Sequence, residues 1–141
     1  MIWKQSFDLP YLNRFFKNTL GENLGMEFSE MGDDYLIIKM PVDRRTVQPY
    51  GLLHGGASVA LAETLGSVAS TMCIEDLEKD MAVGVEINAN HLRPVTKGYV
   101  YGKVAPIRVG RRMHVWNIEI RDEKERLVCV SRLTIAVIGR T

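Results

Sequence analysis

The sequence has few cysteines and no long apolar run. Only two of its 141 residues are cysteine. Cys73 and Cys129 both fall in apolar stretches, so we expect buried thiols rather than disulfides, and a reducing, cytoplasmic location. No segment approaches the roughly 20 apolar residues that a membrane-spanning helix needs. The N-terminus carries charges early and has no apolar block, so we expect neither a signal peptide nor a membrane anchor.

The chain also lacks an excess of charge of either sign. The chain has 18 basic and 17 acidic residues, a net charge of +1, and no basic tract, so nothing indicates a nucleic-acid partner. The three histidines, His54, His91 and His114, are far apart in the sequence, and no cysteine pair has ligand spacing, so we expect no metal site. A serine in a G-x-S-x-G elbow and a glycine-rich phosphate or dinucleotide fingerprint are both missing. We therefore expect neither a serine triad nor a nucleotide cofactor.

What remains is the composition of an ordinary globular domain. Hydrophobic residues make up 46% of the chain and charged residues 25%, both near the usual values. There is no internal repeat and no low-complexity linker. We therefore predict a single domain over residues 1–141.

The chain is organised around residues 46–74, a stretch with one charged side chain, Glu63. The spacing predicts a helix over Gly56–Cys73, because apolar residues repeat every three to four positions along one face. Glu63 falls on the opposite face, whose other members are small or apolar: Gly56, Val59, Ala60, Ser67 and Ser70. A surface helix would carry several charges there. Glu63 is either a stray solvated charge or a functional carboxylate in a lined cleft.

The rest of the chain predicts one short helix and six strands. Asp8–Leu20 has a capping Asp and apolar residues on one face, and Gly21 should end it. The strands follow from alternation and turn residues: Gly25–Glu30, Tyr35–Val42, Met81–Leu92, Tyr99–Val109, His114–Arg121 and Leu127–Ile138. In Met81–Leu92 the alternation puts Val83, Val85, Ile87 and Ala89 on one face.

This content predicts an α+β fold, an antiparallel curved sheet wrapped around one long central helix. One small sheet covers only one side of a helix. The side that carries Glu63 then requires a second subunit, most simply in a homodimer.

Five residues could do chemistry: Gln48, His54, Gly55, Glu63 and Ser67. At a helix start the first amides can bind a developing negative charge, although the Gly55-Gly56 pair could serve only to form the turn. Glu63 suits a general base or a nucleophile towards a carbonyl. Ser67 could hold that carboxylate or a water, or be a packing residue. His54 and Gln48 could bind a carbonyl oxygen, or be ordinary loop residues.

Cationic side chains gather around the turns between the late strands: Arg93, Lys97, Lys103, Arg108, Arg111 and Arg112. Such charges are most often solvated. The Arg111-Arg112 pair beside Gly110 is nevertheless dense enough to hold a phosphate.

The motif Q-P-x-G-x-x-H-G-G-x-x-x-x-L-x-E-x-x-x-S, from Gln48 to Ser67, resembles the hot-dog fold acyl-CoA thioesterases. It is most similar to the aryl-CoA branch that places Glu on the central helix. The resemblance covers nearly the whole chain, including N-x-N-H-L-R-P-V from Asn88 to Val95. It is greatest with the small thioesterases that hydrolyse 1,4-dihydroxy-2-naphthoyl-CoA in menaquinone synthesis. Their relatives clear misacylated carriers in enterobactin synthesis.

The resemblance implies dimers whose sheets join edge to edge, usually as a tetramer of two dimers, with each active site across a dimer interface. Gln48, His54 and the Gly55 amide would come from one subunit, and Glu63 and Ser67 from the other. The Gly55 N–H would polarise the thioester carbonyl, which Glu63 attacks directly or through water. CoA is part of the substrate and no separate cofactor is implied. Its nucleotide arm would meet His91, Arg93 and the turn of Arg108, Gly110, Arg111 and Arg112.

Three alternatives stay open at this point. One is a broad-specificity thioesterase that acts on misacylated carrier protein or medium-chain acyl-CoA. Another is a hydratase or dehydratase on the same fold, and the last is a non-catalytic acyl-CoA binder. The acyl group depends on pocket residues such as Phe16, Leu20, Met72 and Val83, whose positions the motif does not specify.

Overall fold

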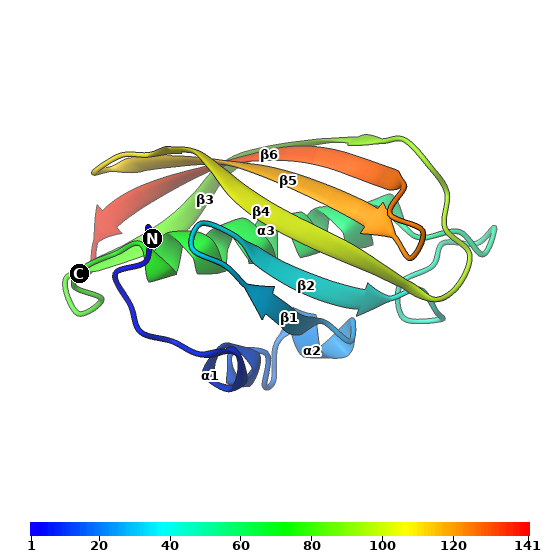
Figure 1. Ribbon diagram of the computed structural model, residues 1–141, viewed down its shortest axis with the longest axis horizontal. Coiled ribbons are helices and arrows are strands. Elements are labelled where there is room, and N and C mark those ends of the chain that lie inside the picture. Colours follow the sequence, from blue (N-terminus) through cyan, green and yellow to red (C-terminus); the bar gives the residue numbers. More distant parts are fainter.

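In the computed structural model, which describes residues 1–141, one six-stranded antiparallel sheet curves around a long helix (Figure 1). The strand order is β1-β2-β4-β5-β6-β3. The strands are β1 (Glu27–Met31), β2 (Leu36–Pro41), β3 (Asp80–His91), β4 (Tyr99–Val109), β5 (Met113–Asp122) and β6 (Leu127–Gly139). The predicted α+β architecture is confirmed. The strands β1 and β3 form the two edges of the sheet.

The long helix α3 (Gly55–Met72) fills the concave side of the sheet. It contains no proline and is rich in alanine, which favours a helix. Leu61, Leu65 and Ala69 are fully buried against inward-facing side chains of the sheet such as Trp116 and Ile118. No helix of the molecule is both long and apolar enough to cross a membrane.

The prediction for Ser70 is wrong. Ser70 does not share the open face of Glu63, because it is fully buried and hydrogen-bonded to His114 and Trp116 of β5. A twisted sheet crosses the helix at an angle, so the face that is open near Glu63 is covered two turns further on.

The predicted helix over Asp8–Leu20 is in fact two short helices, α1 (Leu9–Arg14) and α2 (Leu20–Asn23). Asp8 caps α1 by accepting from the Tyr11 N–H, as expected. The break has a local cause: Asn18 adopts φ +61° and its N–H donates to the Glu22 carboxylate. Gly21 therefore lies inside α2 instead of ending a helix.

A bulge in β3 overturns part of the predicted alternation. The pairing of β3 with β6 shifts between Gly84 and Glu86, and one extra residue reverses the side of the sheet to which side chains point. Ile87 and Ala89 pack on the core as predicted, but before the bulge Ala82 does so instead of Val83. Val85 is 63% exposed.

The first five residues bind the far end of α3. The Trp3 indole N–H donates to the Gly32 carbonyl at 2.7 Å. The Lys4 and Gln5 amides both donate to the Met72 carbonyl, at 2.8 and 3.2 Å. These bonds satisfy an acceptor that a helix end otherwise leaves free.

Candidate active site

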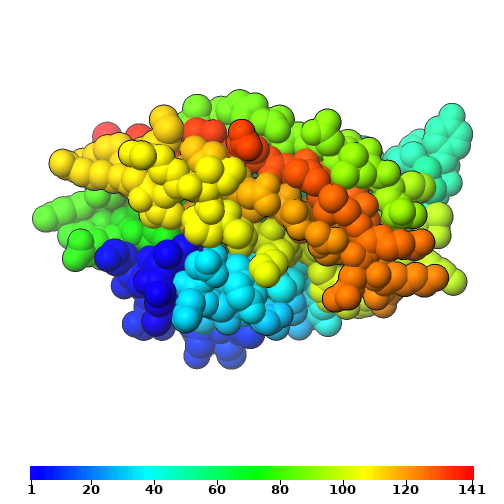
Figure 2. All heavy atoms as spheres, turned by 45° about the horizontal axis from the view of Figure 1, so that its top comes forward, coloured from blue at the N-terminus to red at the C-terminus, as the bar shows by residue number.

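The loop that enters α3 is held at several points. Arg45 donates to the Asp43 carboxylate, which lowers the pKa of Asp43 to about 2. Buried Thr46 donates through its hydroxyl to the Pro41 carbonyl at 2.7 Å. The His54 N–H donates to the Thr46 carbonyl at 2.8 Å. The loop projects from one end of the molecule (Figure 2).

His54 is the N-cap of α3. Its Nδ1 accepts from the Gly56 N–H at 2.8 Å, and its carbonyl accepts from Ala57 and Ser58. The neutral ring therefore carries its proton on Nε2, which is free to donate. Of the first four amides of α3, only the Gly55 N–H has no acceptor in the protein. This amide can bind an oxyanion.

Gln48 and Gly55 line a shared pocket of about 340 Å³ with His91 and Arg93. A Cβ added at Gly55 would lie 2.9 Å from His91 Nε2, so only glycine lets this ring approach the helix start. The Gln48 Oε1 accepts from the backbone amides of Tyr50 and Leu52. Its amide N–H groups consequently remain available to a ligand.

Glu63 and Ser67 of α3 line a different pocket, of about 300 Å³, whose facing wall runs from the end of α1 into the start of α2. Phe15, Phe16 and Leu20 make those walls largely apolar. On its other side, Glu63 lies against β3, where a Cβ added at Gly84 would be 2.5 Å from its Oε2. The carboxylate is half-buried and therefore occupies a lined recess and not open solvent.

The candidates thus form two half-sites on one chain. The first half-site is Gln48, His54 and Gly55, and the second is Glu63 and Ser67. Gly55 and Glu63 are eight residues apart on α3, which corresponds to about 12 Å along the helix axis. A carboxylate at that distance cannot act on a carbonyl held by the Gly55 amide. One chain alone does not assemble the predicted chemistry.

The predicted CoA-binding residues are divided in the same way. Arg93 follows β3 and lies in the Gly55 pocket. The turn that carries Arg108, Arg111 and Arg112 lies at the opposite end of the sheet, where Val137 donates to the Arg112 carbonyl. Arg112 also forms an ion pair with Asp80 at 3.3 Å.

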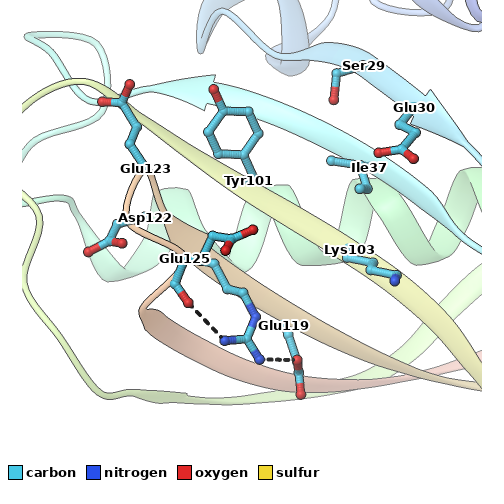
Figure 3. Close-up of a pocket in the computed structure, with 10 residues that line it drawn as sticks. Ser29, Glu30, Ile37, Tyr101, Lys103, Glu119, Asp122, Glu123 and Glu125 are labelled. Atoms are coloured by element: carbon cyan, nitrogen blue, oxygen red, sulfur yellow. Dashed lines mark hydrogen bonds and ion pairs between the residues drawn. The ribbon is translucent and has the colours of Figure 1, made fainter.

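A pocket larger than both of these, of about 580 Å³, contains none of the candidate residues. It lies on the outer face of the sheet, away from α3 (Figure 3). Its lining is charged, and its Arg121 already binds Glu119 and the Glu125 carbonyl. It is lined by none of the candidate residues Gln48, His54, Gly55, Glu63 and Ser67.

Two features of the site escaped the sequence reasoning. Gly84 contacts the Glu63 carboxylate, and a lone glycine inside a strand is a signal for a bulge or a close approach. Phe15 also lines the Glu63 pocket, and a sequence pattern cannot place its terminal segment beside α3.

Phe16 and Leu20, which we expected to shape the acyl pocket, do line the Glu63 pocket. The other two expected pocket residues, Val83 and Met72, line neither half-site pocket, and Met72 is fully buried in the core.

Comparisons with known proteins converge on one chemistry. Residues 50–129 match the family model described as the thioesterase superfamily. The chain is 51% identical to the 1,4-dihydroxy-2-naphthoyl-CoA hydrolase of Escherichia coli, over 98% of this chain and 100% of the relative. It is 50% identical to a proofreading thioesterase of Cronobacter turicensis, over 99% and 100%. A thioesterase structure from Haemophilus influenzae superimposes with a TM-score of 0.95 at 52% identity, over 99% of this chain and 96% of that one.

Proposed function

Because the chain belongs to the thioesterase superfamily, we propose that it hydrolyses aromatic acyl-CoA thioesters, of the 1,4-dihydroxy-2-naphthoyl-CoA or benzoyl-CoA type, to the free acid and CoA. The observation that carries the proposal is a solitary carboxylate, Glu63, in a recess walled by Phe15 and Phe16. An aromatic acyl group fits such walls, and it brings its carbonyl to the carboxylate. The name of the Escherichia coli relative supports the same substrate class.

The residues divide the work as follows. The Gly55 N–H donates to the thioester carbonyl oxygen and stabilises the negative charge that develops there. The Nε2–H of His54 and the free amide of Gln48 orient the carbonyl and the departing sulfur. Glu63 either takes a proton from an attacking water, or attacks the carbonyl carbon to form an anhydride that water then hydrolyses. In both routes the C–S bond breaks and CoA leaves as the thiolate. No cofactor is needed.

A second copy of the chain would join the half-sites. The edge strand β3 pairs only with β6, so its other side can pair with β3 of a second copy. Gly55 lies beside His91, and Glu63 lies beside Gly84. A two-fold axis that brings Gly55 of one protomer to Glu63 of its partner must pass midway between these two levels. The neighbouring strand β6 gives a residue scale for these levels, because it has no bulge there: His91 is paired with Cys129, and Gly84 with Ile135. The residue midway between Cys129 and Ile135 is Arg132. Its partner on β3 is Asn88, so the axis passes at Asn88.

The same two-fold axis also determines where the arginine turn of the partner lies relative to Arg93. The Arg112 carbonyl binds Val137, which opposes Ala82 on β3. The two-fold axis at Asn88 places Ala82 of one protomer at the same height along the strands as Arg93 of the other. The partner's arginine turn then lies level with Arg93, although the two are at opposite ends of one chain. The axis was placed from Gly55 and Glu63 alone, and it brings together the residues expected to hold the nucleotide arm of CoA.

The first test measures thiol release from benzoyl-CoA and 1,4-dihydroxy-2-naphthoyl-CoA. Glu63→Ala should lose activity by orders of magnitude while its circular dichroism spectrum and melting temperature stay close to those of the wild type. Normal turnover by Glu63→Ala would refute the mechanism.

Subunit complementation tests whether the site is shared. Glu63→Ala and Gln48→Ala should each be inactive or nearly so, but mixing and reassociating them should create dimers with one intact site. Random reassortment restores about a quarter of the wild-type activity, because half of the dimers are mixed and each has one working site of two. If the site lies within one chain, mixing restores nothing.

The register is tested by Asn88→Cys, which places two thiols opposite each other at the axis. Oxidation should convert this variant to a covalent dimer on a denaturing gel. Asn90→Cys is the matched control, since Asn90 is also exposed and its two copies would be about 13 Å apart along the strands. That distance exceeds the reach of a disulfide. Cross-linking of Asn90→Cys but not Asn88→Cys would require another register.

The resemblance to proofreading thioesterases, among them the Cronobacter turicensis relative, supports a second candidate, hydrolysis of acyl groups on a carrier protein. The same half-sites would serve, since the thioester and its pantetheine arm are common to both substrates. Comparing kcat/KM for one acyl group on CoA and on a carrier protein distinguishes the two. A panel of aromatic and straight-chain acyl groups then identifies the acyl preference. A tetramer and a cytoplasmic location stay predictions.

A further inference from the structure

A buried hydrogen-bonded trio connects α3 to β5. The Trp116 indole N–H donates to the Ser70 Oγ at 2.7 Å, and the His114 Nδ1 lies 2.9 Å from the same oxygen. All three residues are at most 2% exposed. The proposed reaction does not involve any of these three residues. Apolar side chains could fill the same space, so the polar trio calls for another explanation.

The bonds have one consistent direction. Ser70 accepts from Trp116 and has one proton of its own, and the only acceptor the structure gives that proton is the His114 Nδ1. His114 is therefore neutral, with its proton on Nε2. Burial lowers the pKa of His114, which favours the same state.

His114 also stands next to the cationic turn. It follows Arg112 by two residues, and its ring contacts the backbone of Gly110. The Gly110 N–H donates to the Met113 carbonyl at 2.9 Å, which closes the turn. The Arg108 guanidinium packs over Gly110, where an added Cβ would lie 3.2 Å from its Nε. A displacement of the His114 ring would therefore displace Gly110 and, with it, Arg108.

We propose that His114 is a positioning residue for the nucleotide arm of CoA. Through Ser70 it fixes the arginine turn to α3, the helix that carries Glu63 about 10 Å away along its axis. A satisfied buried network holds its members in one arrangement, whereas apolar packing permits small slips. The inference rests on the proposed function for the identity of the ligand. It adds a residue that touches neither the thioester nor the nucleotide.

Three variants separate positioning from general stability. His114→Leu keeps the approximate volume and removes the bond to Ser70. His114→Asn keeps an acceptor near the position of Nδ1 and should restore the wild-type behaviour. Ser70→Ala removes the same bond from the other side and changes only one atom, so it serves if His114→Leu does not fold. Circular dichroism and thermal melting report the folded state of each.

The test compares the turnover of two substrates and measures the binding of one ligand. One substrate is benzoyl-CoA, and the other is the benzoyl thioester of pantetheine, which lacks the nucleotide. We expect His114→Leu and Ser70→Ala to raise KM for benzoyl-CoA about fivefold to tenfold, the effect of about one lost hydrogen bond, with kcat nearly unchanged. Turnover of the pantetheine thioester should not change. Calorimetric binding of adenosine 3′,5′-bisphosphate should weaken by the same factor as KM rises.

Equal losses on both substrates, or an unchanged KM for benzoyl-CoA in the folded variants, would overturn the proposal. So would a His114→Asn variant that behaves like His114→Leu. Failure of the proposed function is distinguishable, because a wild type that hydrolyses neither thioester refutes that function directly. The binding measurement still decides the role of His114: equal affinities for the bisphosphate in wild type and folded variants refute it.

Discussion

Gly84→Ala tests the placement of the candidate catalytic carboxylate. The new Cβ would lie 2.5 Å from the Glu63 Oε2, whereas ordinary contact begins near 3.4 Å. The carboxylate must therefore shift by about 1 Å, and a misplacement of that size at a reacting group costs about 10²-fold in rate. This corresponds to about 2.7 kcal/mol of transition-state stabilisation.

The fold should tolerate this substitution. The clash falls on the end of a flexible, half-buried side chain beside a pocket of about 300 Å³, so Glu63 has room to move. Gly84 has no positive φ, and alanine in a strand is more stable than glycine by about 0.5–1 kcal/mol. We expect an unchanged or slightly higher melting temperature with a kcat that falls about a hundredfold.

The assay compares kcat for thiol release and the melting temperature in Gly84→Ala and in Gly139→Ala. Gly139 is an exposed strand glycine whose added Cβ would meet nothing closer than the Lys79 carbonyl at 4.0 Å, so its substitution should alter neither quantity. Full kcat in a folded Gly84→Ala protein would show that Glu63 does not act from the position beside β3. An equal loss in Gly139→Ala would trace the effect to the sheet as a whole.

Three further substitutions or titrations follow from the packing. Gly102→Ala should lower the free energy of unfolding by about 1–3 kcal/mol in urea titrations, because its Cβ would lie 2.7 Å from the fully buried Leu65 Cδ1; an unchanged midpoint would contradict this packing. The pKa of His114 is lowered from 6.5 by burial, so folding stability should be complete above pH 6.5 and decline below it, where the unfolded chain binds the extra proton. Urea titrations from pH 5 to 8 should show a shallower decline in His114→Asn. Burial raises the pKa of Cys73 to about 11, so its alkylation at pH 8 should be about a hundredfold slower than that of a free thiol and become fast on unfolding.

The elements that repeat a single period were predictable from the sequence. The spacing of Leu61 and Leu65 placed α3 within one residue at each end, and alternation found all six strands. Glu63 stood out because no other charge lies in residues 46–74. The free Gly55 amide followed from the general geometry of a helix start.

The failures have local or tertiary causes. The bulge at Gly84 adds a single residue to β3, which a period-two pattern cannot register because it depends on how β6 pairs. The break in the first predicted helix depends on one backbone conformation, at Asn18. Ser70 was assigned to the wrong face because the sequence gives the helical phase but not the angle at which the sheet crosses α3.

The attachment of the N-terminal residues to α3 bears on how the protein should be handled. The Met72 carbonyl at the end of α3 accepts from the Lys4 and Gln5 amides, and Trp3 anchors the N-terminal residues to the loop at Gly32. Proteolytic removal of these residues would take away the donors that cap α3, and an affinity tag fused ahead of Met1 would disturb them. A tag after Thr141 would extend from exposed residues and leave these hydrogen bonds of α3 intact.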